Sequence, residues 1–158
     1  MSEAGDFDFL VGSWDVANRR LPKPLTDSHD WDEFPSTSQC RSVLGGTANF
    51  DEISAPARGF CALTLRLFDP ERQEWSLYWA SSRDSRLQPP VTGRFADGTG
   101  TFYSHEIYNG TAIIVRFIWS GITPDSARWE QAFSTDDGKT WETNWIMKFT
   151  RHRSNTPA

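Results

Sequence analysis

The chain has 158 residues, which is the length of one domain, and we expect residues 1–158 to form a single domain. Its net charge of −5 and its lack of a Lys/Arg cluster argue against nucleic acid as a partner. No apolar run approaches the ~18 residues of a membrane helix. The acidic start, residues 1–6, lacks the basic and apolar regions of a signal peptide. These features predict a cytoplasmic protein that does not interact with membranes.

Turn signals divide the chain into short segments rich in β-branched and aromatic residues. Such spacing is typical of an all-β sandwich or barrel. The only helical candidate is one turn at Asp6–Leu10, and the longest loop is expected at 22–33. The ten predicted strands lie near 13–21, 34–44, 47–54, 60–68, 75–82, 91–96, 99–107, 111–120, 127–135 and 141–151.

Two hairpins can be registered from their turns, Asp97-Gly98 and Asn109-Gly110. Both are two-residue turns of the kind that favours positive φ. The second turn places Ser104 opposite Val115, Phe102 opposite Phe117 and Glu106 opposite Ile113. The first places Gly93 opposite Phe102 and Val91 opposite Ser104. Alternation along the strands then defines one face. Its members are Val91, Gly93, Phe95, Phe102, Ser104, Glu106, Ile113, Val115, Phe117 and Trp119.

A third hairpin is expected around Asp136-Asp137-Gly138, as a type I turn followed by a glycine bulge. This register pairs Phe133 with Trp141 and Trp129 with Trp145. One face is then aromatic and the other charged. The aromatic face carries Trp129, Gln131, Phe133, Trp141, Thr143, Trp145, Met147, Phe149 and Arg151, and the charged face Glu130, Ser134, Glu142, Asn144 and Lys148.

Consecutive hairpins with one aromatic face predict a single up-and-down antiparallel β-barrel of about ten strands. Closure of the barrel removes exposed sheet edges. The chain has 8 Trp and 11 Phe, enough to line the inside of such a barrel. Barrels of this size can hold one small ligand in place of a solid core.

The segment Phe7–Trp14, with Gly12-Ser13-Trp14, resembles the start of lipocalin-like proteins, the calycins. The resemblance implies a short helical turn before the first strand. It also implies that an Arg near the end of the last strand packs across the Trp. Arg151 is the matching residue, so Gly12, Trp14 and Arg151 form the expected structural signature. The stretches 129–134 and 137–142 are also similar to a family of uncharacterised bacterial lipocalin-like proteins. The related classes that this implies are an intracellular barrel of the fatty-acid-binding type or a haem-binding barrel of the nitrobindin type.

Polar residues on the predicted inner faces are candidates for ligand contact, since a buried polar group needs a partner. Gln131 is expected to meet a ligand, whereas Glu106 could reach solvent at the rim. Arg20 shares the parity of Trp14 and could grip a carboxylate bidentately, or pair with an acid at the rim. Arg66 lies in a segment that is apolar on both parities, so its direction stays open. The predicted ligand-binding residues are Arg20, Trp79, Phe102, Ser104, Glu106, Val115, Phe117, Gln131 and Trp145.

No catalytic residue, metal site or cofactor is predicted. His29, His105 and His152 lie in a loop, on an outer face and at the chain end, so none suits an axial haem ligand or a nucleophilic triad. Cys40 and Cys61 form no CxxC motif and have no His at zinc spacing. They are expected to be two separate free cysteines, with a disulfide left open.

Three hypotheses for function remain. The leading one is a barrel that binds a small hydrophobic or amphipathic ligand. The second is an enzyme on the same scaffold, a lyase, isomerase or cyclase acting on a hydrophobic carbonyl compound, with Glu106 as acid or base. The third is a filled barrel that binds a partner protein. Its outer wall would carry Tyr103, Ile107, Ile114 and Ile118, which form a homodimer patch or are covered by the 22–33 loop.

Overall fold

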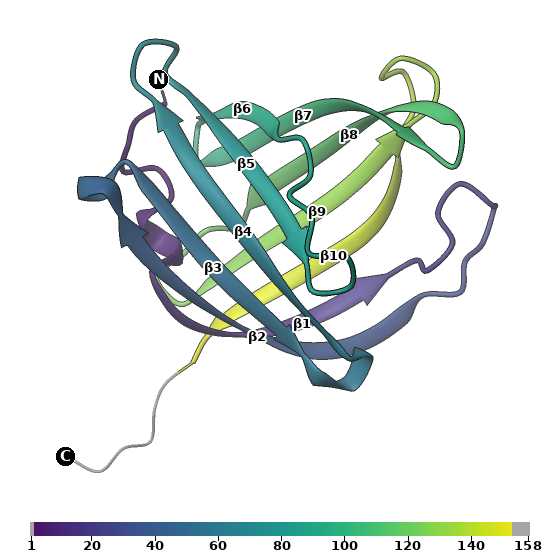
Figure 1. The fold of residues 1–158 in the computed structure, drawn as a ribbon, viewed down its shortest axis with the longest axis horizontal. Helices are drawn as coiled ribbons and strands as arrows, with labels where there is room; N and C mark the ends of the chain where they lie inside the picture. Colours follow the sequence, from purple (N-terminus) through teal and green to yellow (C-terminus); the bar gives the residue numbers. More distant parts are fainter. Residues whose placement is uncertain (1, 153–158) are drawn as a thin grey trace.

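Ten antiparallel strands form one closed barrel in the computed structural model, which describes residues 2–152 (Figure 1). Each strand pairs with the next in sequence, and β10 returns to pair with β1. The prediction of an all-β up-and-down barrel is therefore confirmed. The strands are β1 (Gly12–Arg20), β2 (Asp32–Val43), β3 (Ala48–Ala55), β4 (Phe60–Asp69), β5 (Glu74–Ser81), β6 (Val91–Ala96), β7 (Thr99–Tyr108), β8 (Thr111–Ser120), β9 (Ser126–Ser134) and β10 (Glu142–Arg151).

Alternating burial along the strands explains why the sequence forms a barrel. In β2, buried Phe34, Ser36, Ser38 and Cys40 alternate with exposed neighbours. Side chains of a strand point to opposite faces in turn, so every second residue enters the interior. The observed strand bounds differ from the predicted ones by at most two residues.

The β6–β7 and β7–β8 hairpins have the register that their two-residue turns predict. Ser104 lies opposite Val115, and Phe102 lies opposite both Phe117 and Gly93. Asn109 and Asp97 both adopt positive φ in the turns. The β6–β7 ladder ends at the pair of Thr92 with Tyr103, one pair short of the predicted contact between Val91 and Ser104.

The predicted β9–β10 register is wrong. Phe133 pairs with Glu142, one residue beyond the predicted Trp141. The register then shifts by a further residue between Thr143 and Trp145, so that Trp129 pairs with Met147. Asn144 occupies this bulge and is buried, not solvent-facing as predicted. Such an extra residue cannot be read from alternation, since it resets the alternation beyond it.

A hydrogen-bonded loop widens the β9–β10 connection. Asp136 accepts hydrogen bonds from the backbone N–H of Thr140 at 2.8 Å and from the Ser134 hydroxyl at 2.8 Å. The side-chain hydrogen bond from Thr140 contributes most to lowering the pKa of Asp136 to about 2. Trp141 lies on the outer wall and not on the inner face. Its ring covers Arg116, whose guanidinium carbon is 4.2 Å from the ring centroid, and packs beside Tyr103.

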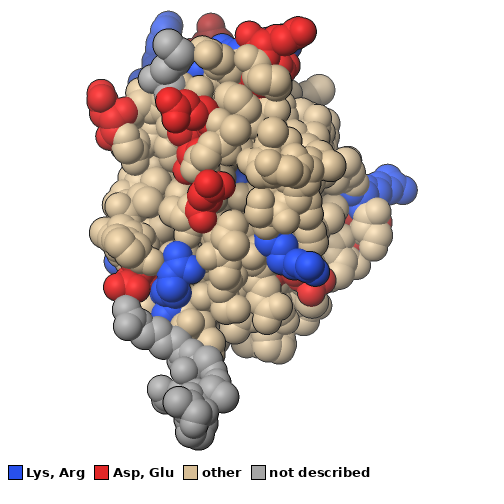
Figure 2. Space-filling model, turned by 90° about the vertical axis from the view of Figure 1, so that its left-hand side faces the viewer, with Lys and Arg blue, Asp and Glu red and all other residues tan. Residues whose placement is uncertain are grey.

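The left-hand end of the barrel in Figure 1 is closed by the residues before β1. A 3-10 turn, η1 (Asp8–Leu10), corresponds to the predicted helical turn. Leu10 of this turn and Phe7 before it are fully buried. Phe7 meets Trp75 and Phe95 edge to face, with ring centroids 4.9 Å apart in both pairs. Figure 2 views this end, where uncharged side chains form most of the surface and charged ones are scattered.

The signature at the closed end has the predicted cation–π contact. The guanidinium of Arg151 lies 4.1 Å from the Trp14 ring centroid. The same guanidinium donates hydrogen bonds to the carbonyls of Pro124, Val11 and Phe9 at 2.8–2.9 Å. Gly12 has φ +122°, and a Cβ there would lie 2.7 Å from Arg151 Nη1, so a larger residue would displace the arginine.

The outer wall of β7 and β8 is partly uncovered. Ile107 is 78% exposed and Tyr103 is 45% exposed, and Trp141 rather than the 22–33 loop packs beside Tyr103. No helix among residues 2–152 is long and apolar enough to cross a membrane.

Candidate functional site

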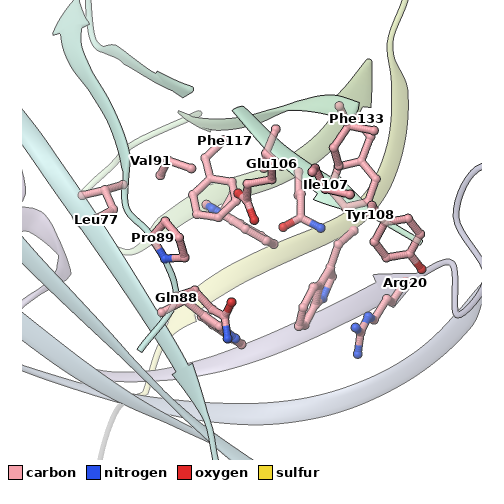
Figure 3. A pocket seen from close by; sticks show the side chains of 16 residues that line it. Arg20, Leu77, Gln88, Pro89, Val91, Glu106, Ile107, Tyr108, Phe117 and Phe133 are labelled. Atoms are coloured by element: carbon pink, nitrogen blue, oxygen red, sulfur yellow. The ribbon is translucent and has the colours of Figure 1, made fainter. Parts of the chain in front are cut away.

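A cavity of about 210 Å³ lies inside the open half of the barrel (Figure 3). Phe7, Trp75 and Phe95, here called the Phe7 cluster, pack together in the closed half. The closed half is therefore filled, and the cavity lies in the open half. The walls come from β1, β5–β10 and the loop between β5 and β6. The lining residues are Arg20, Leu77, Trp79, Gln88, Pro89, Val91, Glu106, Ile107, Tyr108, Ile113, Val115, Phe117, Trp129, Gln131, Phe133 and Trp145.

Aromatic rings set the shape of the cavity wall. Trp145 meets Trp79 and Trp129 edge to face, with ring centroids 5.8 and 5.6 Å apart. Phe117 meets Trp129 in the same way at 5.0 Å. Edge-to-face pairs of this kind add about 0.5–1.5 kcal/mol each beyond burial alone. The wall is therefore a pre-formed apolar surface of fixed geometry.

Glu106 is half-buried and its carboxylate points into the cavity (Figure 3). One carboxylate oxygen accepts a hydrogen bond from the Ser104 hydroxyl at 2.5 Å. The two side chains lie two residues apart on β7 and so share a face of that strand. Ser104 thus orients the one carboxylate in the cavity lining.

Gln131 and Asn144 form a second polar contact beside the cavity. Gln131 Nε2 donates to Asn144 Oδ1 at 2.8 Å. The bulge in β10 turns Asn144 inward, so the missed register also hid this contact. Gln131 lines the cavity with its position fixed by this bond.

Arg20 lies where the cavity meets solvent. Its guanidinium carbon is 4.3 Å from the Trp145 ring centroid, within cation–π range. Burial lowers the pKa of Arg20, the positive charge of Arg83 lowers it further, and Asp32 offsets part of the effect. Arg20 is thus a partly desolvated cation at the mouth of an apolar cavity.

The loop after β5 covers one side of the cavity with Gln88 and Pro89, which lie between two of the predicted strands (Figure 3). β5 and β6 pair over just three residues, Trp75–Leu77 of β5. The loop fills the gap beyond them, and the backbone N–H of Gln88 donates to the Trp79 carbonyl at 2.8 Å. Tyr108 is another wall residue that we did not predict as a ligand contact, although it shares the parity of Glu106.

A buried ion pair lies deeper in the barrel, and sequence reasoning missed it. Arg66 Nη2 is 2.6 Å from Asp51 Oδ2, and the two side chains are 3% and 1% exposed. Asn49 Oδ1 accepts a further hydrogen bond from Arg66 at 3.1 Å. The pair lines a small cavity of about 20 Å³, which shares Trp79, Phe117 and Trp129 with the larger one. The direction of Arg66 is thereby settled as inward.

Both cysteines are free, as predicted, but their surroundings differ. Cys40 is buried and Cys61 is exposed. Burial raises the pKa of the Cys40 thiol to about 11, with a smaller opposing effect of Arg66. Thiolate is the reactive form, so Cys40 is inert at neutral pH for two reasons, protonation and lack of access.

We expect a disulfide reagent such as Ellman's reagent to label one thiol per native chain quickly at pH 8. The second thiol should react only after unfolding. In Cys61→Ser the fast phase should vanish, whereas Cys40→Ala should keep it. Two fast thiols in the native wild type would contradict the buried position of Cys40.

Seven of the nine predicted ligand-binding residues line the larger cavity, namely Arg20, Trp79, Glu106, Val115, Phe117, Gln131 and Trp145. Ser104 stands beside it through its bond to Glu106. Phe102 lies elsewhere: it is fully buried against Phe7 in the closed half. The cavity is lined by no histidine, and the described residues contain no cluster of three or more His, Cys, Asp or Glu placed to hold a metal.

These features define a closed ten-stranded antiparallel up-and-down barrel with a cavity at its open end. No protein family model matches the sequence, and no curated protein matches it. Among solved structures the fold is similar to that of the S-type phycobiliprotein lyase CPES from Guillardia theta. The TM-score is 0.60 at 18% sequence identity, over 98% of this chain and 95% of that chain. At this identity the likeness shows a shared fold.

Proposed function

We propose that this barrel binds a small amphipathic molecule in the cavity of its open half. The observation that carries the proposal is the cavity itself, about 210 Å³ of space walled by Trp79, Trp129, Trp145 and Phe117. Ligand sites are mostly apolar with a few placed polar groups, and Glu106 and Gln131 are such groups here. The volume equals that of about seven water molecules at ~30 Å³ each, which suits a ligand of one or two rings.

The test is a titration with 1-naphthylamine, an uncharged two-ring probe whose emission shifts to shorter wavelengths in apolar surroundings. We expect saturable binding, with quenching of tryptophan fluorescence as energy passes to the probe. Val115→Phe adds a ring inside the cavity and should weaken binding about tenfold or more. The new ring would displace part of the probe from its wall contacts, and a loss of ~1.4 kcal/mol in binding free energy corresponds to a tenfold weaker affinity.

Ala112→Phe is the matched control, because Ala112 is exposed on the same strand. It should leave probe affinity unchanged. Thermal melts establish that both variants fold. No saturable binding to the wild type, or equal losses in the two variants, would refute cavity binding.

Catalysis in the same cavity is the second candidate function. Two observations favour it: the similar fold belongs to a protein described as a lyase, and Glu106 places a hydrogen-bonded carboxylate among apolar walls. A carboxylate so placed can accept or donate a proton at a bound carbonyl compound. Native mass spectrometry of the purified protein identifies any small molecule bound to it. That molecule should then be turned over by the wild type and bound without turnover by Glu106→Gln. Equal turnover by both proteins would exclude Glu106 as the acid or base.

A further inference from the structure

Three arginines surround the mouth of the barrel. Arg20 ends β1, Arg58 belongs to the β3–β4 turn, and Arg83 lies two residues after the end of β5. They line a depression of about 200 Å³ together with Pro22, Asp32, Phe34 and Phe60. Arg20 lines both this depression and the apolar cavity, so the two spaces adjoin at this residue.

One of the three positive charges is neutralised and two are not. Arg58 binds Asp32 through two hydrogen bonds, one of them from Nε to Oδ2 at 2.7 Å. This bidentate contact chiefly lowers the pKa of Asp32, which is therefore ionised at neutral pH. Asp32 is the only acidic residue in the lining of the depression. Within residues 2–152, neither Arg20 nor Arg83 forms an ion pair with a carboxylate.

Aromatic rings hold the two uncompensated guanidinium groups in place. Arg20 lies over Trp145, and Arg83 lies 5.1 Å from the Phe60 centroid. Arg83 uses one donor on the Arg58 carbonyl at 3.1 Å. A guanidinium has five N–H donors in a planar fork, so both groups keep donors free for an incoming anion. Two neighbouring cations also repel each other, and the effect of Arg83 on the pKa of Arg20 reflects that repulsion.

We infer that Arg20 and Arg83 bind a carboxylate of the ligand whose apolar part occupies the cavity. This inference rests on the proposed function and names its ligand class: a small ring compound carrying one carboxylate. The carboxylate relieves the repulsion between the two cations and receives charge-assisted hydrogen bonds from them. The net charge of −5 repels anions from the molecule as a whole, so a preference for an anionic ligand must arise locally at these arginines.

The test compares two ligands of equal shape, 2-naphthoate and its uncharged analogue 2-naphthamide, as competitors of 1-naphthylamine at pH 7 and low salt. The wild type should bind the carboxylate about tenfold more tightly than the amide, as expected for charge-assisted hydrogen bonds. Arg20→Gln and Arg83→Gln should each remove most of that preference, measured as the ratio of the two affinities in the same variant. Arg83 is exposed, so its variant keeps the fold even where Arg20→Gln perturbs Trp145.

Arg41→Gln is the charge-matched control, because Arg41 is exposed near the closed end of β2. It should behave as the wild type with both ligands. Equal affinities of wild type for naphthoate and naphthamide would overturn the carboxylate site, while probe binding would still uphold the apolar cavity. Failure of all three compounds to bind would instead refute the proposed function. A loss in Arg41→Gln equal to that in Arg83→Gln would show a general charge effect and overturn the inference.

Discussion

Asp51→Ala should destabilise the protein by about 3–5 kcal/mol, the range observed when one partner of a buried ion pair is removed. The variant leaves the Arg66 guanidinium, 3% exposed, without its carboxylate at 2.6 Å. Asn49 accepts one hydrogen bond from this group but carries no charge to balance it. Urea unfolding followed by tryptophan fluorescence gives the free energy of unfolding.

Two further variants separate the loss of the pair from the loss of a side chain. Glu33→Ala breaks the exposed contact with Arg19 at 3.1 Å and should change stability by at most about 1 kcal/mol. Arg66→Met in the Asp51→Ala background removes the stranded charge and should recover part of the stability. An Asp51→Ala protein within about 1 kcal/mol of wild type would contradict the importance of this pair.

Strand positions followed from the sequence because they depend on local chemistry. The turns at Asp97-Gly98 and Asn109-Gly110 require positive φ, and alternation between them leaves one register that buries the apolar face. The pairing of Phe102 with Phe117 is a direct consequence. The contact of Arg151 with Trp14 followed instead from the resemblance to calycins, which brought the two chain ends together.

Features that depend on packing between distant segments could not be predicted. The bulge at Asn144 has no turn residue to mark it, and it moved the pairs beyond it, such as Trp129 with Met147. Arg66 lies in a strand with apolar residues on both parities, so only its meeting with Asp51 of β3 fixes its direction. The cavity arises because the Phe7 cluster fills one half of the barrel and not the other. The loop with Gln88 covers the cavity because β5 and β6 pair over only three residues. The short pairing depends on both strands together and cannot be read from either one alone.

Trp14→Ala is the second change with a large expected effect, a loss of about 3–5 kcal/mol. Trp14 is 1% exposed and its indole N–H donates to the Leu10 carbonyl at 2.8 Å, which ties η1 to β1. Its ring also supports Arg151, which bonds to three carbonyls of the segments around it. Removal of the ring therefore leaves a void and removes the cation–π contact of Arg151, whose hydrogen bonds hold the segments at the closed end together.

Trp31→Ala is the matched control for the same truncation at the surface. Trp31 is half-buried and meets Arg19 at 4.8 Å, a contact between groups in partial solvent. It should cost about 1 kcal/mol or less. If packing at the closed end does not determine the shape of the cavity, a folded Trp14→Ala protein should bind the naphthylamine probe at low temperature with wild-type affinity. Loss of probe binding in a folded variant would show instead that the shape of the cavity depends on the closed end. The two halves of the barrel would then form one packing unit.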